Sequence, residues 1–315
     1  MAGSPTSVRA STLDAIGGTP VVRLSKVVPP ESADVLVKLE YFNPTGSYKD
    51  RMALSMIEEA ERRGDLRPGM TVVEYTGGST GSSLAFVCAV KGYPFTVVSS
   101  DAFAREKLQT MAVFGANVVI VPSEGGKITP DLIPKMQEEA RLRAAAGETY
   151  PTDQFNNRDT LVGYGKIGEE LLSQVAGPID VFCGGVGVGG MLIGVATALR
   201  AGGSAARIVA LEPAGSPVLT TGRPGTHHVE GTGVGFVPPL LKDGGYDEAR
   251  AIDEAEARAM ARRLAREEGI FAGVSSGMNV VGALALAREL GPGKTVVTVA
   301  VDTGLKYLAG DLFQE

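Results

Sequence analysis

The sequence predicts an α/β fold made of two three-layer α/β domains, each with a mostly parallel sheet. Two observations lead to this prediction. Short runs rich in β-branched residues alternate with amphipathic segments of helical period along nearly the whole chain. Strands of this kind are typical of parallel sheets covered by helices on both faces. The length of 315 residues then suggests about two domains, at about 150 residues each.

The individual elements follow from local composition. The strand runs are short and β-branched, and the helical runs are longer, carry one apolar face and mostly end at a glycine. We expect strands at 33–40, 70–76, 95–100, 117–123, 179–185, 207–213 and 294–302. We expect helices at 49–64, 81–92, 104–115, 128–147 (despite Pro134), 163–175, 189–202, 253–269 and 279–291.

A lysine stands at the start of the first expected helix. The stretch NPTGSYKDR supplies a turn with Thr45 or Ser47 as N-cap, and Gly64 is a suitable C-cap. Lys49 lies on the apolar face of this helix and near the positive end of its dipole, and both effects favour the neutral amine. It is either an ordinary lysine that reaches solvent or a Schiff-base lysine or general base. The apolar residues on its face are Met52, Ala53, Met56, Ile57 and Ala60.

Composition excludes several functional classes. The net charge of -6 offers no basic surface for nucleic acid. Cys88 and Cys183 each lie in an apolar run and are expected to be core residues without a disulfide. His227 and His228 have no third ligand at metal spacing, so no metal is expected, and no GxSxG motif indicates a serine hydrolase. With no apolar leader and no spanning segment, we expect a cytoplasmic protein that binds no membrane.

Two glycine-rich loops each follow an expected strand and open an expected helix. They are EYTGGSTG at 74–81 and GGVGVGG at 184–190. Because the N–H groups at the start of a helix bind anions, the chain offers two anion sites, one in each half. The alternative for either loop is a tight turn without a ligand.

The second loop also allows a different interpretation. Gly185, Gly187 and Gly190 satisfy GxGxxG after a strand, and Glu212 ends the next strand, where a dinucleotide-binding fold places its ribose acid. A nicotinamide enzyme therefore stays open at this point. Thr303 ends the last strand, where it could face a ligand or cap the next turn.

Together these motifs resemble the pyridoxal-phosphate enzymes of the cysteine synthase and cystathionine β-synthase family, whose fold type is that of the tryptophan synthase β subunit. The resemblance runs from LDAIGGTPVVRL to DTGLKYL, and so covers nearly the whole chain. It rests on several motifs in order, which is more specific than one glycine motif. NPTGSYKDR matches the lysine motif, so the resemblance makes Lys49 the Schiff-base residue.

The other motifs assign the remaining site residues by the same resemblance. TGGSTG matches the loop for the substrate carboxylate, QFNN supplies a glutamine, and GVGVGGM matches the phosphate loop. GTGVGF and GVSSG match two further active-site loops, and DTG faces the pyridine nitrogen. The implied substrate-binding residues are Thr76, Gly77, Gly78, Ser79, Thr80, Gln154, Gly231 and Thr232. The implied cofactor-binding residues are Lys49, Ser79, Gly185, Val186, Gly187, Val188, Gly189, Gly190, Met191, Ser275 and Thr303.

The resemblance implies a cofactor and a reaction. The cofactor is pyridoxal 5'-phosphate, and the reaction is β-replacement on an O-activated serine through an aminoacrylate, with sulfide, a thiol or a specialised nucleophile. Lys49 holds the cofactor and then, as a neutral amine, takes the Cα proton. β-Elimination, as in dehydratases, ammonia-lyases or desulfhydrases, is the alternative with the same cofactor. A nicotinamide oxidoreductase and a non-catalytic binding protein are the alternatives without it.

Four positions depart from the family pattern. Ser79 stands where an asparagine is usual, near the ring hydroxyl of the cofactor, and Val188 and Met191 stand where threonines are usual in the phosphate loop. Fewer hydroxyls should weaken the phosphate site or shift its contacts to the backbone and other side chains. Thr303 replaces the commoner serine, and a neutral hydroxyl at the ring nitrogen makes a weaker electron sink, which favours β-elimination over racemisation or transamination. The departures leave the nucleophile open.

The resemblance also implies the domain organisation. We expect a smaller, mobile substrate-binding domain at 42–150 and a larger cofactor-phosphate-binding domain of 1–41 plus 151–315, with the cofactor in the cleft between them. The polar, irregular stretch around Pro151 fits such a break. The expected partner is a small amino-acid substrate, and the family is usually homodimeric. The chain ends soon after DTGLKYL, so no C-terminal regulatory module is expected.

Overall fold

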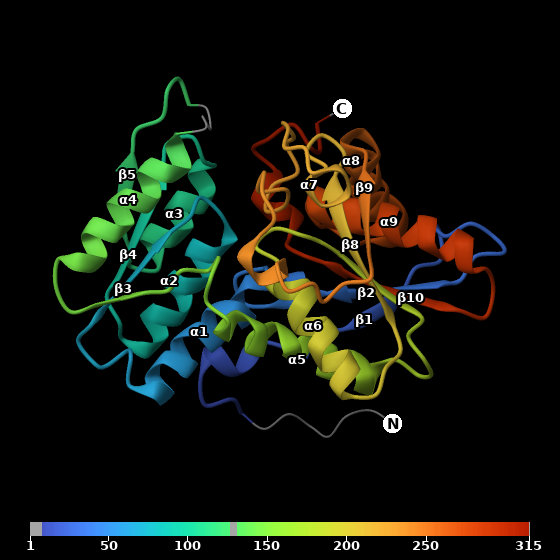
Figure 1. Ribbon diagram of the computed structural model, residues 1–315, viewed down its shortest axis with the longest axis horizontal. Helices are drawn as coiled ribbons and strands as arrows, with labels where there is room; N and C mark the ends of the chain where they lie inside the picture. Colours follow the sequence, from blue (N-terminus) through green and yellow to red (C-terminus); the bar gives the residue numbers. More distant parts are fainter. Residues whose placement is uncertain (1–7, 127–130, 315) are drawn as a thin grey trace.

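The computed structural model describes residues 8–126 and 131–314. In this part the chain forms two α/β units, each built on its own sheet (Figure 1). The unit drawn in teal to green lies on the left of Figure 1, and the unit drawn in blue and in yellow to red lies on the right. Both sheets are mostly parallel and carry helices, so the predicted fold class is confirmed.

The larger sheet orders its strands β1-β2-β10-β7-β8-β9, and only β1 runs antiparallel to its neighbour. Its two faces are both covered, since Phe182 packs with the cluster that includes α6 and Cys183 packs with the cluster that includes α9. Two edge strands, β1 and β9, were not predicted because they are short and only partly buried. The strands are β1 (Val21–Arg23), β2 (Asp34–Leu39), β7 (Val181–Gly185), β8 (Arg207–Pro213), β9 (Glu248–Ile252) and β10 (Thr295–Ala300).

The smaller sheet is entirely parallel and orders its strands β5-β4-β3-β6. Its fourth strand was not predicted, because TYP is too short to carry a period-2 pattern. Tyr150 of this strand pairs with Val72 in register, which places the chain just before Thr152 against the central strand. The strands are β3 (Thr71–Tyr75), β4 (Phe95–Ser100), β5 (Asn117–Val121) and β6 (Thr149–Pro151).

Each predicted helix is present in the described chain, whereas several of the predicted helix ends differ from the observed ones. The α-helices are α1 (Lys49–Arg63), α2 (Ser79–Lys91), α3 (Arg105–Val113), α4 (Leu132–Ala145), α5 (Asp159–Gln174), α6 (Gly190–Ala201), α7 (Val218–Thr221), α8 (Glu254–Arg263) and α9 (Val274–Leu290). Short helical turns are η1 (Thr12–Ala15), η2 (Glu40–Phe42), η3 (Pro239–Leu241), the π-helical η4 (Leu264–Glu268) and η5 (Gly304–Tyr307).

Several predicted helix ends were wrong, and glycine explains two of them. The predicted starts of α5 and α9 were too late, because each helix has a glycine near its start and glycine has a low helix propensity. Both glycines are required by packing: a Cβ on Gly163 would be 2.2 Å from the Arg51 carbonyl oxygen, and one on Gly277 would be 2.1 Å from that of Ala257. Residues 128–130 of the helix predicted at 128–147 lie outside the described residues.

Pro134 is tolerated because it lies in the first turn of α4, where the backbone N–H has no intrahelical partner. Cys88 and Cys183 are buried and unpaired, as predicted. The apolar face of α1 is also as predicted, since each of its members is fully buried, namely Met52, Ala53, Met56, Ile57 and Ala60. Across the described ranges, the helices are too short or too polar to cross a bilayer.

Candidate active site

Lys49 is the first residue of α1 and is enclosed by the fold, with only 9 % of the residue exposed. Its Nζ lies 5.2 Å from the centre of the Tyr48 ring. Burial lowers the pKa of the Lys49 amine to about 8, and the carboxylates of Glu74 and Asp302 limit this fall. A large fraction of the amine is therefore neutral near pH 8, as a nucleophile or a base requires.

The turn before α1 fixes the direction of this lysine. Gly46 has a φ of 72°, and a Cβ there would be 2.6 Å from the methyl carbon of Thr303. Ser47 accepts the N–H of the lysine at 3.3 Å, but Tyr48 is the N-cap residue of α1, so the prediction of Thr45 or Ser47 as N-cap was wrong. Thr45, the other candidate, instead donates its N–H and hydroxyl to Asp50, at 2.7 and 2.5 Å. The turn and the helix start are thus tied together.

A buried ionic network under α1 was not expected from the sequence. Arg51 donates to Glu40 and to Glu170, both at 2.7 Å. Lys38 of β2 also pairs with Glu170 and donates to the carbonyl of Thr19 at 2.6 Å. Burial alone would raise the pKa of Glu170, but pairing with the Arg51 guanidinium outweighs it and lowers this pKa to about 2. The network anchors α1 to β2 and α5. The feature of the sequence that could have indicated it is a lysine inside the apolar strand VLVKLE.

The loop 76–81 between β3 and α2 forms the first predicted anion site. A Cβ on Gly77 would be 2.1 Å from the ring of Phe103, so the loop is held closely. In the described chain, the N–H groups of Gly77, Ser79 and Thr80 have no protein acceptor. These groups are free to bind an anion at the start of a helix, as predicted for a carboxylate.

Gln154 lies beside this loop, as the resemblance implied. Thr80 donates its hydroxyl to Gln154 Oε1 at 2.8 Å, and 6 % of the glutamine is exposed. The backbone N–H of Gln154 donates to the carboxylate of Glu74 at 3.1 Å, and Thr152 donates its hydroxyl to the same oxygen at 2.7 Å. Glu74 was not predicted as a site residue, although a carboxylate inside the apolar strand TVVEY indicates a buried polar contact.

The loop 185–191 between β7 and α6 forms the second predicted anion site, and it is buried throughout. Within the described residues, the N–H groups of residues 187–190 have no protein acceptor. Gly189 has a φ of 89°, and a Cβ on Gly187 would lie 2.2 Å from the carbonyl oxygen of Gly231. The loop is a cradle of free N–H groups whose path requires glycine.

The side chains of this loop bring no hydroxyl to the site. Val188 and Met191 are both buried and apolar. Thr232, predicted for the substrate, packs against this loop, since its methyl carbon would be 3.2 Å from a Cβ on Gly185. Its hydroxyl donates to the carbonyl of Val229 at 2.9 Å. The contacts that this loop itself offers to a phosphate are therefore those of its backbone N–H groups.

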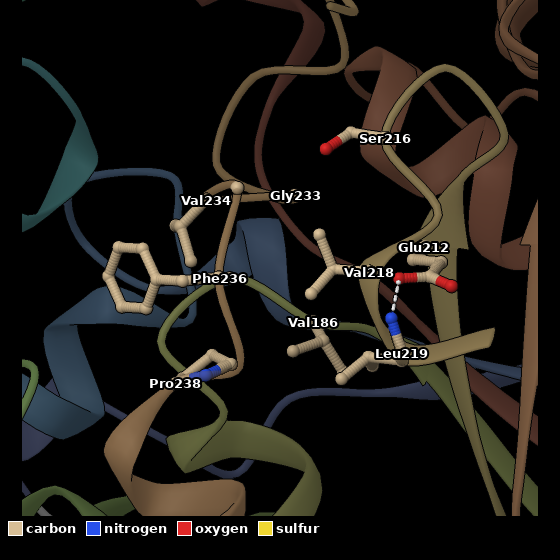
Figure 2. A pocket seen from close by; sticks show the side chains of 11 residues that line it. Val186, Glu212, Ser216, Val218, Leu219, Gly233, Val234, Phe236 and Pro238 are labelled. Carbon is tan, nitrogen blue, oxygen red and sulfur yellow. Dashed lines mark hydrogen bonds between the residues drawn. The ribbon is translucent and has the colours of Figure 1, made fainter. Parts of the chain in front are cut away.

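A small pocket beside the phosphate loop is lined by Val186, Glu212 and residues 233–236, among others (Figure 2). Its volume of about 10 Å³ admits no more than a single water. Glu212 accepts the N–H groups of Leu219 and Thr220, at 2.7 and 2.8 Å. The carboxylate that the nicotinamide alternative needed is therefore used as a cap for α7.

The two side-chain hydroxyls predicted to bind the cofactor, those of Thr303 and Ser275, are placed differently. Thr303 accepts the N–H of Leu305 at 3.3 Å, and so caps η5, as its alternative interpretation held. Ser275 lies in the first turn of α9 with 4 % of the residue exposed. Its hydroxyl has no hydrogen bond to any described residue, so it is the freer of the two. The role of either hydroxyl in binding the cofactor stays a prediction.

A polar cluster that joins the two units was also missed. Lys306 of η5 donates to Ser79 at 3.1 Å, and Tyr307 donates to Asp302 at 2.8 Å. Asp302 is 4 % exposed, and its Oδ1 has no partner in the described chain. Burial lowers the pKa of Lys306, and Asp302 opposes the shift. Ser79 thus faces a cation at the position where the family usually has an asparagine.

The residues present fit pyridoxal 5'-phosphate. The free N–H groups of residues 187–190 suit a phosphate dianion, and the enclosed amine of Lys49 suits an aldehyde carbon. Free hydroxyl and N–H groups remain at Ser275 and in the loop 76–81. The described part of the chain holds no group of three or more His, Cys, Asp or Glu residues suited to a metal.

Comparisons with known proteins agree with this fit. The family model described as "Pyridoxal-phosphate dependent enzyme" matches residues 12–302. A cysteine synthase of Staphylococcus aureus (strain N315) is 45 % identical over 299 residues, which are 95 % of each chain. The matched family and the relative both point to pyridoxal phosphate as the cofactor, so the nicotinamide alternative is wrong.

Solved structures give the same result. An O-ureido-L-serine synthase has a TM-score of 0.89 at 37 % identity, covering 98 % of this chain and 96 % of the other. A cysteine synthase from Entamoeba histolytica has a TM-score of 0.91 at 32 % identity, covering 100 % and 94 %. A hydrogen sulfide-producing enzyme from Fusobacterium nucleatum has a TM-score of 0.89 at 32 % identity, covering 97 % and 100 %. The chain therefore belongs to the family of pyridoxal-phosphate dependent enzymes.

Proposed function

We propose that this protein catalyses pyridoxal-phosphate-dependent β-replacement on an O-activated serine, with sulfide or another small nucleophile as second substrate. The observation that carries the proposal is the position of Lys49. Its enclosed amine lies at the start of α1, and each sheet unit presents one helix start with free N–H groups. A carboxylate and a phosphate can therefore be bound separately, as a reaction between an amino acid and this cofactor requires.

The chain's own residues divide the work. The loop 185–191 would hold the phosphate of the cofactor through backbone N–H groups, and Lys49 would bind its carbonyl carbon. When bound, the cofactor supplies an electron sink that makes the Cα proton of an amino acid acidic. The loop 76–81 and Gln154 would orient the substrate carboxylate, so that the proton to be removed faces the lysine.

Lys49 is the candidate for proton transfer. Its pKa of about 8 leaves part of the amine neutral at ordinary working pH, where it accepts a proton. Glu74 and Asp302 are the acidic side chains that act on it electrostatically; Glu74 accepts from Thr152, and Asp302 accepts from Tyr307. The amine therefore carries the acid–base role in this proposal.

The names of similar proteins support the substrate class. The Staphylococcus aureus relative is named cysteine synthase, and one structural neighbour is an O-ureido-L-serine synthase. Both names describe amino acids with a heteroatom substituent on the β-carbon, which favours β-replacement with a nucleophile that differs between proteins. A hydrogen sulfide-producing neighbour favours β-elimination as the second candidate. Keto acid formed without an added nucleophile would identify that second reaction.

The absorption spectrum tests the proposal most directly. We expect the purified protein to be yellow, the Lys49→Ala variant to lose that band, and activity to fall by about a thousandfold or more. O-acetylserine added to the wild type should shift the band, and sulfide should restore it with release of cysteine. A protein that stays unchanged with every activated serine contradicts the proposal. Keto acid in place of cysteine supports the second candidate.

We further propose a homodimer in the cytoplasm, with a smaller domain at 42–150 that closes over the substrate. The resemblance of the motifs supports the dimer and the domain limits. The buried, unpaired state of Cys88 and Cys183 fits a reducing compartment, and burial raises the pKa of both thiols to about 12. Light scattering at micromolar concentration tests the dimer, and a monomer mass would contradict it.

A further inference from the structure

Glu74 is a fully enclosed carboxylate that the proposed reaction does not use. It is 2 % exposed and lies near the end of β3, directly before the loop 76–81. Its Oε1 accepts the N–H of Tyr75 at 2.9 Å. Its Oε2 accepts the hydroxyl of Thr152 at 2.7 Å and the N–H of Gln154 at 3.1 Å. Three donors on a buried carboxylate make a defined structure at the edge of the candidate site.

Two of these donors come from the segment that supplies the substrate glutamine. Thr152 also donates its own N–H to the carbonyl of Val73, so the segment runs along β3. On its other side, Thr80 donates to Gln154 Oε1 at 2.8 Å. The amide is therefore held at its backbone by Glu74 and at its oxygen by Thr80. Its NH₂ group has no acceptor among the described residues and is left for a ligand.

We propose that Glu74 is a positioning residue for the substrate carboxylate: it holds the Thr152–Gln154 segment against the loop 76–81, so that the Gln154 amide points its NH₂ group at the bound amino acid. The proposal rests on the proposed function, because it names the same carboxylate site. It adds that this site is assembled by a carboxylate that does not touch the substrate. The ionised form of Glu74 holds the three donors more strongly, because charge-assisted hydrogen bonds are stronger than neutral ones, and protonation adds an O–H that must itself find an acceptor.

Ionisation then controls substrate binding. Burial raises the pKa of Glu74 to about 7, against the hydrogen bonds from Thr152, Gln154 and Tyr75. Two charged groups face it: Asp153 raises the pKa further, and the Lys49 amine is coupled to it electrostatically. Above about pH 7 the carboxylate is ionised and holds the segment. As the pH falls through 7, it takes up a proton and its hydrogen bonds to the segment weaken, so the KM for the amino acid should rise.

The Glu74→Gln variant of the holoenzyme tests the proposal. Because an amide has one acceptor oxygen in place of two, we expect the KM for O-acetylserine to rise by about tenfold at pH 9. We expect kcat to stay within about threefold, and the pH dependence of KM near pH 7 to disappear. The dissociation constant of L-alanine, which has no leaving group, should change in parallel, measured by the absorbance of the bound cofactor. An unchanged KM and an unchanged pH profile would overturn the proposal.

The Thr152→Val variant gives a second test that does not depend on the first variant folding. It removes one donor and keeps the shape of the side chain, so the pKa of Glu74 should rise. The pH at which KM rises should therefore move upward, while KM at pH 9 stays within about threefold of the wild type. An unmoved transition would show that Glu74 does not set it, and would overturn the proposal.

Glu212→Gln is the matched control, because Glu212 is equally buried and also accepts three donors, but caps α7 in the other unit. It should lower thermal stability about as much as Glu74→Gln and leave the pH profile of KM unchanged. Equal pH effects in both variants would reduce Glu74 to a structural residue. If the wild type binds L-alanine with the expected pH dependence but turns over no O-acetylserine, the proposed reaction fails and this inference stands.

Discussion

Lys49 owes its chemistry to where it lies, because a lysine in water has a pKa near 10.4 and would be fully charged. The fold encloses the amine, and burial lowers its pKa to about 8. Two carboxylates, Glu74 and Asp302, keep the fall from going further. At the residue scale, the site therefore balances desolvation against nearby negative charge to keep a reactive amine.

This balance predicts the effect of Asp302→Asn. Removing a negative charge near Lys49 should lower the pKa of its amine below 8, since Asp302 raises that pKa in the wild type. The measurement is the rate of reductive methylation of Lys49 in the cofactor-free protein, read by mass spectrometry across a pH series. Reactivity should appear at lower pH in the variant. A pKa of Lys49 near 10.4 in the wild type would contradict the argument.

At the scale of elements, glycine decides how closely the helices approach. α5 packs against α1 and α6 through glycines on its surface. A Cβ on Gly168 would be 2.7 Å from the Cβ of Ala198, whereas one on Gly165 would meet no atom closer than 3.7 Å. The same helix therefore contains glycines that packing requires, Gly163 and Gly168, and one that it does not, Gly165.

The pair gives a prediction for stability. Gly168→Ala should destabilise the protein by about 1–3 kcal/mol, because the added carbon overlaps its neighbours. Gly165→Ala should stabilise it by about 0.5–1 kcal/mol, because alanine loses less backbone entropy in a helix. Urea unfolding of both variants measures the difference. Equal effects of the two substitutions would mean that the contacts of α5 are looser than described.

The phosphate loop gives a prediction for cofactor binding. Gly187→Ala should raise the dissociation constant of pyridoxal phosphate by at least about tenfold, because its Cβ would overlap the carbonyl oxygen of Gly231 at 2.2 Å. A titration of the cofactor-free variant, followed by absorbance, measures this constant. Gly165→Ala is the control and should bind as tightly as the wild type. Unchanged affinity in Gly187→Ala would place the phosphate elsewhere.

At the scale of the whole molecule, polar contacts join the two sheet units across the site. Lys107 of α3 pairs with Glu230 of the larger unit, and its Nζ lies 5.2 Å from the centre of the Tyr307 ring. The lysine side chain is 6 % exposed, whereas that of Glu230 is 53 % exposed. A buried cation is thus satisfied by a carboxylate that can reach water.

The asymmetry of this pair can be tested. Glu230→Ala should destabilise the protein by about 1–2 kcal/mol, because it leaves a buried ammonium without its anion. Lys107→Met should cost less than about 1 kcal/mol, because methionine keeps the contact with the Tyr307 ring and leaves only an exposed carboxylate. Thermal unfolding at low and high salt measures both. A larger loss in Lys107→Met than in Glu230→Ala would contradict this account.

The sequence alone determined the parts that repeat or that use local geometry. The alternation of strands and helices, the buried face of α1, the Gly64 C-cap and the two glycine-rich loops that open α2 and α6 were all predicted, because period, capping and glycine turns depend on neighbours in the chain. The ordered motifs then identified the family, which the comparisons confirmed.

Only the tertiary structure decided the long-range polar contacts. Glu74 meets Gln154 across 80 residues, and Lys306 meets Ser79 across 227. Such pairs leave no period in the sequence, since each is set by which strands become neighbours. Their one local trace is a charged residue inside an apolar strand, as at Glu74. Its partner could not be named, because desolvation demands a partner but does not specify where in the chain it lies.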